Sequence, residues 1–179
     1  MARYFDNRQK DNIIEVLLPG ETRPHYENAG RANIRGVEFS GKRYLSTALY
    51  LAGSLLSQTS NDGNGHSDIA NVANFGAKAG VSYSTNRGSI SLFDVYQGDV
   101  VDRLHNTLNP QPAAYQLLAV HGTLNLDKVL KMTREIALTL QIENLLDRPL
   151  WAPALGNPAT DTVPFNKGRA VYIGLKFGL

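Results

Sequence analysis

Strict alternation between apolar and polar residues is the feature of this sequence that most limits its fold. Three segments show it, at residues 73–85, 135–143 and 171–179. An α-helix, with 3.6 residues per turn, would scatter the apolar side chains of each segment around its axis, whereas a β-strand places them on one face. We therefore predict a strand in each segment. The predicted apolar faces comprise Ala73, Phe75, Ala77, Ala79, Val81 and Tyr83, then Ile136, Leu138, Leu140 and Ile142, then Val171, Ile173, Leu175, Phe177 and Leu179.

Weaker alternation predicts further strands at residues 13–18, 49–55 and 116–126. Together with the clear segments this gives about eight strands, and no helix is needed anywhere. In the last two segments, Leu49, Leu51 and Leu55 oppose Tyr50, Ala52 and Ser54, and Leu118, Val120, Leu124 and Leu126 oppose Gln116, His121 and Asn125.

At two places the apolar positions change parity within a predicted strand. One change lies between Ile90 and Leu92 on one side and Phe93 and Val95 on the other, and a similar change surrounds Gly36. An extra residue in one strand shifts the following side chains to the opposite face. The sequence therefore predicts a β-bulge at each place.

The predicted connections are alternately short and long. A soluble β-sandwich binding module has no reason to alternate in this way, whereas a membrane barrel has short turns at one end and long loops at the other. The sequence therefore predicts an all-β, antiparallel, up-and-down transmembrane β-barrel. The short connections are residues 41–46, 85–88 and 127–133, and the long ones are residues 19–30, 59–72, 98–112 and 145–168.

Composition excludes several other classes of protein. The chain contains no cysteine, which rules out a disulfide framework, thiol catalysis and a thiolate metal site. Its 18 Lys and Arg residues and 16 Asp and Glu residues are spread along the sequence, so no basic patch predicts nucleic-acid binding. No apolar run is long enough for a transmembrane helix. The N-terminus lacks the pattern of a signal peptide, so we expect that any export signal was removed or belongs to an upstream part of the protein.

No group of residues in the sequence forms a recognisable catalytic or metal-binding motif. Residues 61–68 are rich in Asn, Asp and Gly, but their spacing does not complete an EF-hand loop. Asp94 and the nearby acids Asp99 and Asp102 have no base or metal ligand beside them in the sequence. The histidines are far apart, at His25, His66, His105 and His121. We therefore expect no enzymatic activity, no metal and no cofactor, and we expect His121 to lie on the polar face of its strand.

Four stretches resemble TonB-dependent outer-membrane receptors, and they occur in the order found in that family. Residues 168–177, a glycine followed by RAVYIGLKF, resemble the closing barrel strand, and IENLLDRP at residues 142–149 is similar to the penultimate strand and its turn. YENAG at residues 26–30 and IRGVEF at residues 34–39 resemble an earlier barrel segment. These stretches are distributed over most of the chain, from residue 26 to residue 177.

The resemblance implies a function and a set of partners. Family members have an N-terminal plug and a barrel of about 22 strands. Residues 1–179 would then be the C-terminal part of the barrel domain, without the plug. The implied function is TonB-dependent uptake of a scarce nutrient, such as a ferric siderophore, haem, cobalamin or an oligosaccharide, across the Gram-negative outer membrane. The implied partners are the plug, the remaining barrel strands, the TonB complex and the barrel assembly machinery, which would read the closing strand at Tyr172, Gly174, Phe177 and Leu179.

The alternation also predicts which side chains face the lipid of the outer membrane. The lumen would receive Lys78, Gln141, Glu143 and Lys176. A complete barrel of about eight strands, acting as an adhesin, a structural protein or a lipid-modifying protein, is the alternative. If the chain is instead part of a larger barrel, its first and last strands would be left with unpaired edges. The predicted lipid-facing residues are Val171, Ile173, Leu175, Ile136, Leu138 and Leu140.

Overall fold

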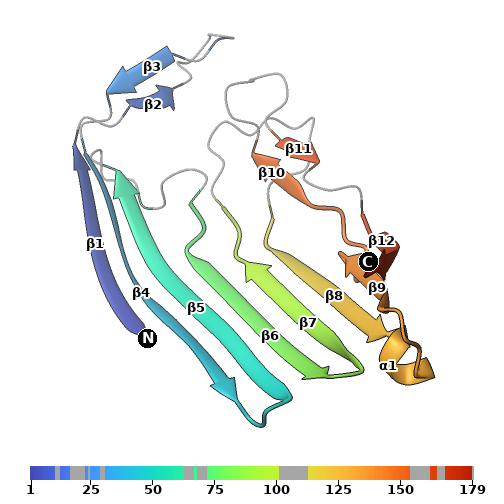
Figure 1. Cartoon of the computed structure of the whole chain (residues 1–179). Coiled ribbons are helices and arrows are strands. Elements are labelled where there is room, and N and C mark those ends of the chain that lie inside the picture. The colour runs from blue at the N-terminus through green and yellow to red at the C-terminus, as the bar shows by residue number, and fades with distance from the viewer. Residues whose placement is uncertain are drawn as a thin grey trace.

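The computed structural model consists almost entirely of β-strands (Figure 1). It describes residues 1–10, 13–16, 23, 25–28, 31–62, 67, 72–100, 113–153, 162–164 and 168–178. In chain order the elements are β1 (Ala2–Lys10), β2 (Ile13–Val16), β3 (His25–Asn28), β4 (Arg31–Tyr44), β5 (Leu49–Asp62), β6 (Phe75–Thr85), β7 (Gly88–Gln97), β8 (Tyr115–Asn125), α1 (Leu126–Leu130), β9 (Ile136–Glu143), β10 (Trp151–Pro153), β11 (Thr162–Pro164) and β12 (Ala170–Phe177).

Eight strands form one sheet in the order β1-β4-β5-β6-β7-β8-β9-β12. Every neighbouring pair is antiparallel, and the two remaining pairs, β2–β3 and β10–β11, form small separate sheets. The turns that join β4 to β5, β6 to β7 and β8 to β9 all lie at one end of the sheet, and the longer connections start from the other end (Figure 1). The predicted up-and-down arrangement with alternating short and long connections is therefore confirmed.

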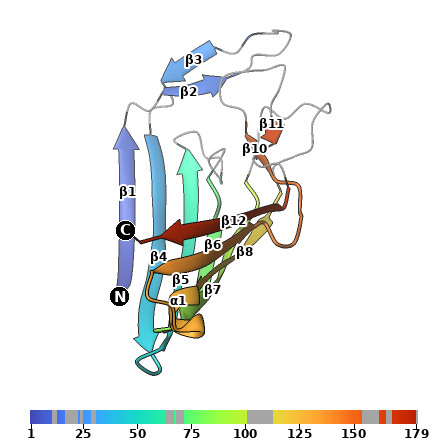
Figure 2. The same ribbon diagram turned by 45° about the vertical axis from the view of Figure 1, so that its right-hand side comes forward.

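The sheet is a curved arc with two ends. Figure 2 shows β9 and β12 curving forward from the layer formed by the preceding strands. The strand order begins at β1 and stops at β12, and among the described residues these two strands do not pair with each other. Each therefore has one edge whose backbone N–H and C=O groups lack a sheet partner.

Two predictions about individual elements were wrong. The first strand of the sheet is β1 and not residues 13–18, since residues 13–16 pair with β3 outside the main sheet. The connection after β8 contains a five-residue helix, α1, although no helix was expected. This helix ends because Lys131 adopts a left-handed conformation, with φ of 55°, which lets Met132 N–H donate to the carbonyl of Asp127.

The two predicted bulges are also absent, because the register of β4 and of β7 with both neighbours is continuous. The apolar residues that broke the pattern, Ile34, Phe93 and Val95, lie on the face of the sheet opposite to Val37 and Leu92, and at each place an aromatic ring covers a glycine. Phe5 is directly opposite Gly36, and Phe93 is directly opposite Gly80. A Cβ on Gly36 would lie 2.8 Å from the Phe5 ring, and one on Gly80 would lie 2.8 Å from the Phe93 ring. Each ring thus occupies the space that a side chain would fill, and no extra residue is required.

The sheet has no apolar core of the usual kind. Ala32 and Leu150 are the buried hydrophobic residues of the described part of the chain. Large apolar side chains are instead exposed along one face, such as Leu55 at 51% and Ile173 at 72%. Soluble proteins rarely expose an apolar surface of this extent. No helix in the part of the chain that the structure describes is long and apolar enough to cross a membrane.

Candidate functional site on the polar face of the sheet

Cross-strand register assigns the side chains of the sheet to two chemically different faces. Residues directly opposite each other in an antiparallel pair point to the same side. One row across the sheet runs Tyr44, Tyr50, Ser82, Ser91, His121, Gln141, Tyr172, and the neighbouring row runs Arg43, Leu51, Val81, Leu92, Val120, Ile142, Val171. We call the face of the first row the polar face and the face of the second row the apolar face.

The predicted lumen residues all lie on the polar face. Lys78 is directly opposite Ser54, Gln141 is directly opposite His121, and Lys176 is directly opposite Ala137. Glu143 accepts a hydrogen bond of 2.7 Å from the amide of Gln141. His121, predicted on this face, is there and contacts the Phe93 ring edge to face at 6.1 Å.

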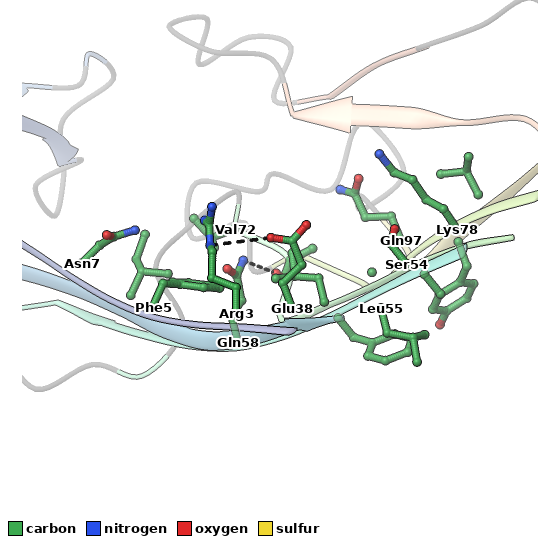
Figure 3. A pocket seen from close by; sticks show the side chains of 18 residues that line it. Arg3, Phe5, Asn7, Glu38, Ser54, Leu55, Gln58, Val72, Lys78 and Gln97 are labelled. Carbon is green, nitrogen blue, oxygen red and sulfur yellow. Dashed lines mark hydrogen bonds and ion pairs between the residues drawn. The ribbon is translucent and has the colours of Figure 1, made fainter. Parts of the chain in front are cut away.

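A cavity of about 640 Å³ opens on the polar face where β1, β4, β5, β6 and β7 meet (Figure 3). Arg3, Glu38 and Lys78 project into it from three different strands (Figure 3). The Arg3 guanidinium lies 3.8 Å from the Glu38 carboxylate. Gln58 lies in the floor and donates to the carbonyl of Ala73 at 2.7 Å. The cavity thus presents both charges and amide groups, which suits contact with another polar segment of protein or with water.

The short-turn end of the polar face carries a cation between two aromatic rings. The Lys42 ammonium lies 3.9 Å from the centre of the Tyr50 ring and 4.8 Å from that of Tyr44. The two rings are themselves in contact, at 5.7 Å between centres. Such an arrangement holds the ammonium through the negative ring faces and fixes the end of this hairpin.

The turn after β9 is built around a buried asparagine. Asn144 has 1% of its surface exposed and a positive φ of 47°. Its amide donates to the carbonyl of Arg148 at 2.7 Å and accepts from the N–H of the same residue at 3.2 Å. These bonds close the turn in the NLLDR stretch at residues 144–148. The sequence pointed to this stretch through family resemblance and gave no physical reason for it.

Asp147 connects the same turn to the start of β12. The backbone N–H of Arg169 donates to its carboxylate at 2.8 Å, and the Arg169 guanidinium lies 3.5 Å away. The backbone hydrogen bond, assisted by the guanidinium charge, lowers the pKa of Asp147 below its ordinary value. The carboxylate therefore stays ionised at neutral pH and holds the last strand in register.

The predicted apolar residues of the last two strands lie on one face. Val171, Ile173, Leu175 and Phe177 are directly opposite Ile142, Leu140, Leu138 and Ile136, in that order. All four side chains of β12 are exposed. Of the residues expected to guide barrel assembly, Tyr172 and Gly174 lie on the polar face, Phe177 lies on the apolar face, and Leu179 lies outside the described residues.

On β7 and β8, two polar residues interrupt the apolar face, and the sequence did not predict them there. Asp94 is directly opposite Leu118 and points to the apolar face. Gln116 lies two residues before Leu118 in β8 and points to the same face, although the sequence predicted it on the polar side. The Gln116 amide donates to Asp94 at 2.7 Å. Within the described chain, no three acidic or histidine side chains are close enough to hold a metal ion. His66, His105 and most of residues 61–68 fall outside the described residues.

Comparison with known proteins gives one sequence family and one fold. The family model described as TonB dependent receptor-like, beta-barrel, matches residues 2–145. No curated protein sequence matches the chain. Among solved structures, the copper transporter OprC is 17% identical, with a TM-score of 0.72 over 99% of this chain and 28% of that one.

Two further structures share the fold. The structure of the FpvAI–pyocin S2 complex matches with a TM-score of 0.72 and 12% identity, over 97% of this chain and 23% of that one. A mutant of the ferric enterobactin receptor PfeA from Pseudomonas aeruginosa matches with a TM-score of 0.62 and 19% identity, over 97% of this chain and 28% of that one. The chain thus spans about a quarter of the length of these structures. Its match to the family model over most of its length shows that the chain belongs to the TonB-dependent receptor β-barrel family.

Proposed function

We propose that residues 1–179 are the C-terminal part of the barrel domain of a TonB-dependent transporter in the outer membrane of a Gram-negative bacterium. The observation that carries this proposal is the separation of side chains on one curved sheet, with exposed apolar residues on one face and polar residues on the other. A sheet that crosses a bilayer must expose apolar residues to lipid and must pair its backbone groups within the protein.

In this proposal the apolar face contacts lipid and the polar face lines the barrel lumen. Ile136, Leu138 and Leu140 would meet acyl chains together with the apolar residues of β12. Lys78 and the Arg3–Glu38 pair would meet the plug or the water that surrounds it. Charged side chains on a lumen wall remain hydrated or paired, which removes the cost of burying them.

The proposed partners follow from the whole receptor. The edges of β1 and β12 would pair with strands supplied by the rest of the barrel, and TonB would act through the plug domain. The barrel assembly machinery would engage β12, including Tyr172, Gly174, Phe177 and Leu179. An open strand edge of this kind offers backbone groups to a partner strand.

The proposed substrate is a scarce nutrient such as a ferric siderophore, haem, cobalamin or an oligosaccharide. The similar structures include a copper transporter and a ferric enterobactin receptor, which supports a transport role and does not select one substrate. They are transporters and receptors, which supports a protein without enzymatic activity. The alternative of a complete small barrel is disfavoured by the linear strand order.

Uptake measurements test this function. Cells that carry the complete receptor, and cells from which it has been deleted, are supplied with radiolabelled ferric enterobactin, haem, cyanocobalamin, maltodextrin and copper(II). We expect one probe to accumulate only in cells with the receptor, and we expect an uncoupler of the proton gradient to abolish that accumulation. Accumulation that persists after uncoupling would contradict energy-coupled transport and would indicate a passive pore.

A further inference from the structure

The apolar face carries a cluster of basic residues at its long-loop end. In the register of β1 with β4, Arg8 is opposite Asn33, Lys10 is opposite Arg31, and Arg35 is opposite Asp6. Tyr4 and Val37 form the next pair of the same parity, so these residues all point to the apolar face. We call Arg8, Lys10, Arg31 and Arg35 the basic cluster, and all four are exposed.

The charge of this cluster is only partly balanced. Among the described residues, Asp6 is the sole acidic residue on this face of β1, β4 and β5, and its carboxylate lies 3.0 Å from the Arg8 guanidinium. Within the described part of the chain, Lys10 and Arg31 form no ion pair. They are directly opposite each other, and like charges in that position destabilise a strand pair. A bound anion would remove this repulsion.

The cluster begins where the apolar surface ends. Toward the long loops, the last cross-strand row with large apolar side chains contains Tyr4 of β1, Val37 of β4 and Phe75 of β6. The Tyr4 side chain is 66% exposed. Exposed aromatic side chains mark the level of the lipid headgroups in membrane barrels. With a rise of about 3.3 Å per residue along a strand, Arg35 lies at most about 7 Å beyond Val37, and Arg31 at most about 20 Å.

Other strands do not repeat this arrangement. At the same end of the apolar face, β5 carries Thr59 and Asn61, and β8 carries Gln116. Arg169, which precedes β12, is already paired with Asp147. Among the described residues of this face, the excess positive charge at the long-loop end is therefore found on β1 and β4, which points to one localised site.

We infer that the basic cluster binds the phosphorylated headgroup of a membrane lipid in the leaflet nearest the long loops. This inference rests on the proposed membrane function, because the lipid must reach the apolar face of the sheet. Because Arg8 already donates to Asp6 through Nε and Nη2, the forked donors that match phosphate oxygens come from Arg31 and Arg35, and Lys10 adds a point charge. The acyl chains of the same molecule would lie on the apolar rows below.

The test compares lipid binding by the complete receptor and by a double variant, Lys10→Gln with Arg31→Gln, in neutral detergent micelles. The probe is diphosphoryl lipid A, with dephosphorylated lipid A as the matched lipid. Each basic residue near an anionic lipid contributes about fivefold, so we expect the variant to bind the diphosphoryl probe about 25-fold more weakly. The control variant is Arg43→Gln, which removes an exposed basic residue from the same face of β4 at its other end.

We expect the native receptor to prefer the phosphorylated probe, the control to bind like the native protein, and the double variant to keep its heat-modifiable barrel migration. Equal binding of the two probes, or an equal loss in the Arg43 variant, would overturn the inference while leaving the proposed function intact. A native receptor that shows no barrel migration in detergent would overturn both.

Discussion

Replacing Ile173 with arginine is expected to destabilise the lipid-inserted receptor by about 2–4 kcal/mol, the cost of a charged residue near the centre of the lipid face of a barrel. Ile173 is 72% exposed on the apolar face and lies directly opposite Leu140. The nearest residues in that row, Leu140 and Gly122, offer the guanidinium no hydrogen-bond partner. The free energy of unfolding is measured by urea titration of the complete receptor in phospholipid vesicles.

The matched control for this substitution is Tyr172→Arg, which adds the same charge one residue earlier. Tyr172 is 55% exposed and lies on the polar face opposite Gln141. Because a lumen position remains hydrated, we expect its cost to be below about 1 kcal/mol. Full stability of the Ile173 variant together with a large loss in the Tyr172 variant would reverse the assignment of the two faces.

Replacing Asn144 with alanine is expected to lower the same free energy of unfolding by about 2–4 kcal/mol. The substitution removes both hydrogen bonds to the backbone of Arg148 and leaves those groups unsatisfied in a buried turn. It also places alanine at a φ of 47°, a left-handed conformation that asparagine tolerates better.

Two companion variants separate these causes. Asn144→Gly also loses the hydrogen bonds, but glycine adopts a positive φ without strain. We therefore expect the Asn144→Gly receptor to be more stable than the Asn144→Ala receptor. Asn86→Ala alters an exposed asparagine in the short turn between β6 and β7, and we expect no measurable change. An Asn144→Ala receptor as stable as the Asn86→Ala receptor would show that the NLLDR turn does not hold the last two strands together.

The strand pattern could be predicted from the sequence because the two faces of the sheet have different surroundings, and this difference imposes a period of two on the residues. The segments 135–143 and 171–179 pair with their predicted faces aligned, since a slip of one residue would move Ile173 to the polar side. The alternation of short and long connections then fixed the up-and-down order. These features depend on local pattern, which a single sequence displays.

Other features depend on contacts between strands and were misread for that reason. Phe93 looked like evidence for a bulge because its partner, Gly80, is on the next strand and could not be identified from the sequence. The sequence did not predict β1, because the half of this strand nearest the long loops carries charged residues, such as Asp6 and Arg8, on the apolar face. The placement of Asp94 beside Gln116 likewise follows from register alone.

The central claim is that this sheet is an arc of a larger barrel, and disulfide trapping between its two end strands tests it most directly. Residues 1–179 contain no cysteine, and any cysteine elsewhere in the receptor is first replaced by serine, so that only the introduced pairs can react. In the complete receptor in whole cells, Tyr4→Cys is combined with Ile173→Cys and, separately, with Leu175→Cys. The positive control is Leu140→Cys with Ile173→Cys, which are directly opposite in β9 and β12 and within the reach of a disulfide. If the sheet is an arc of a larger barrel, we expect the control pair to form a disulfide rapidly. We expect the cysteine at position 4 to form no disulfide with either position in β12. An intramolecular disulfide between Tyr4 and either β12 position would contradict it, because β1 and β12 would then be neighbours in a small closed barrel.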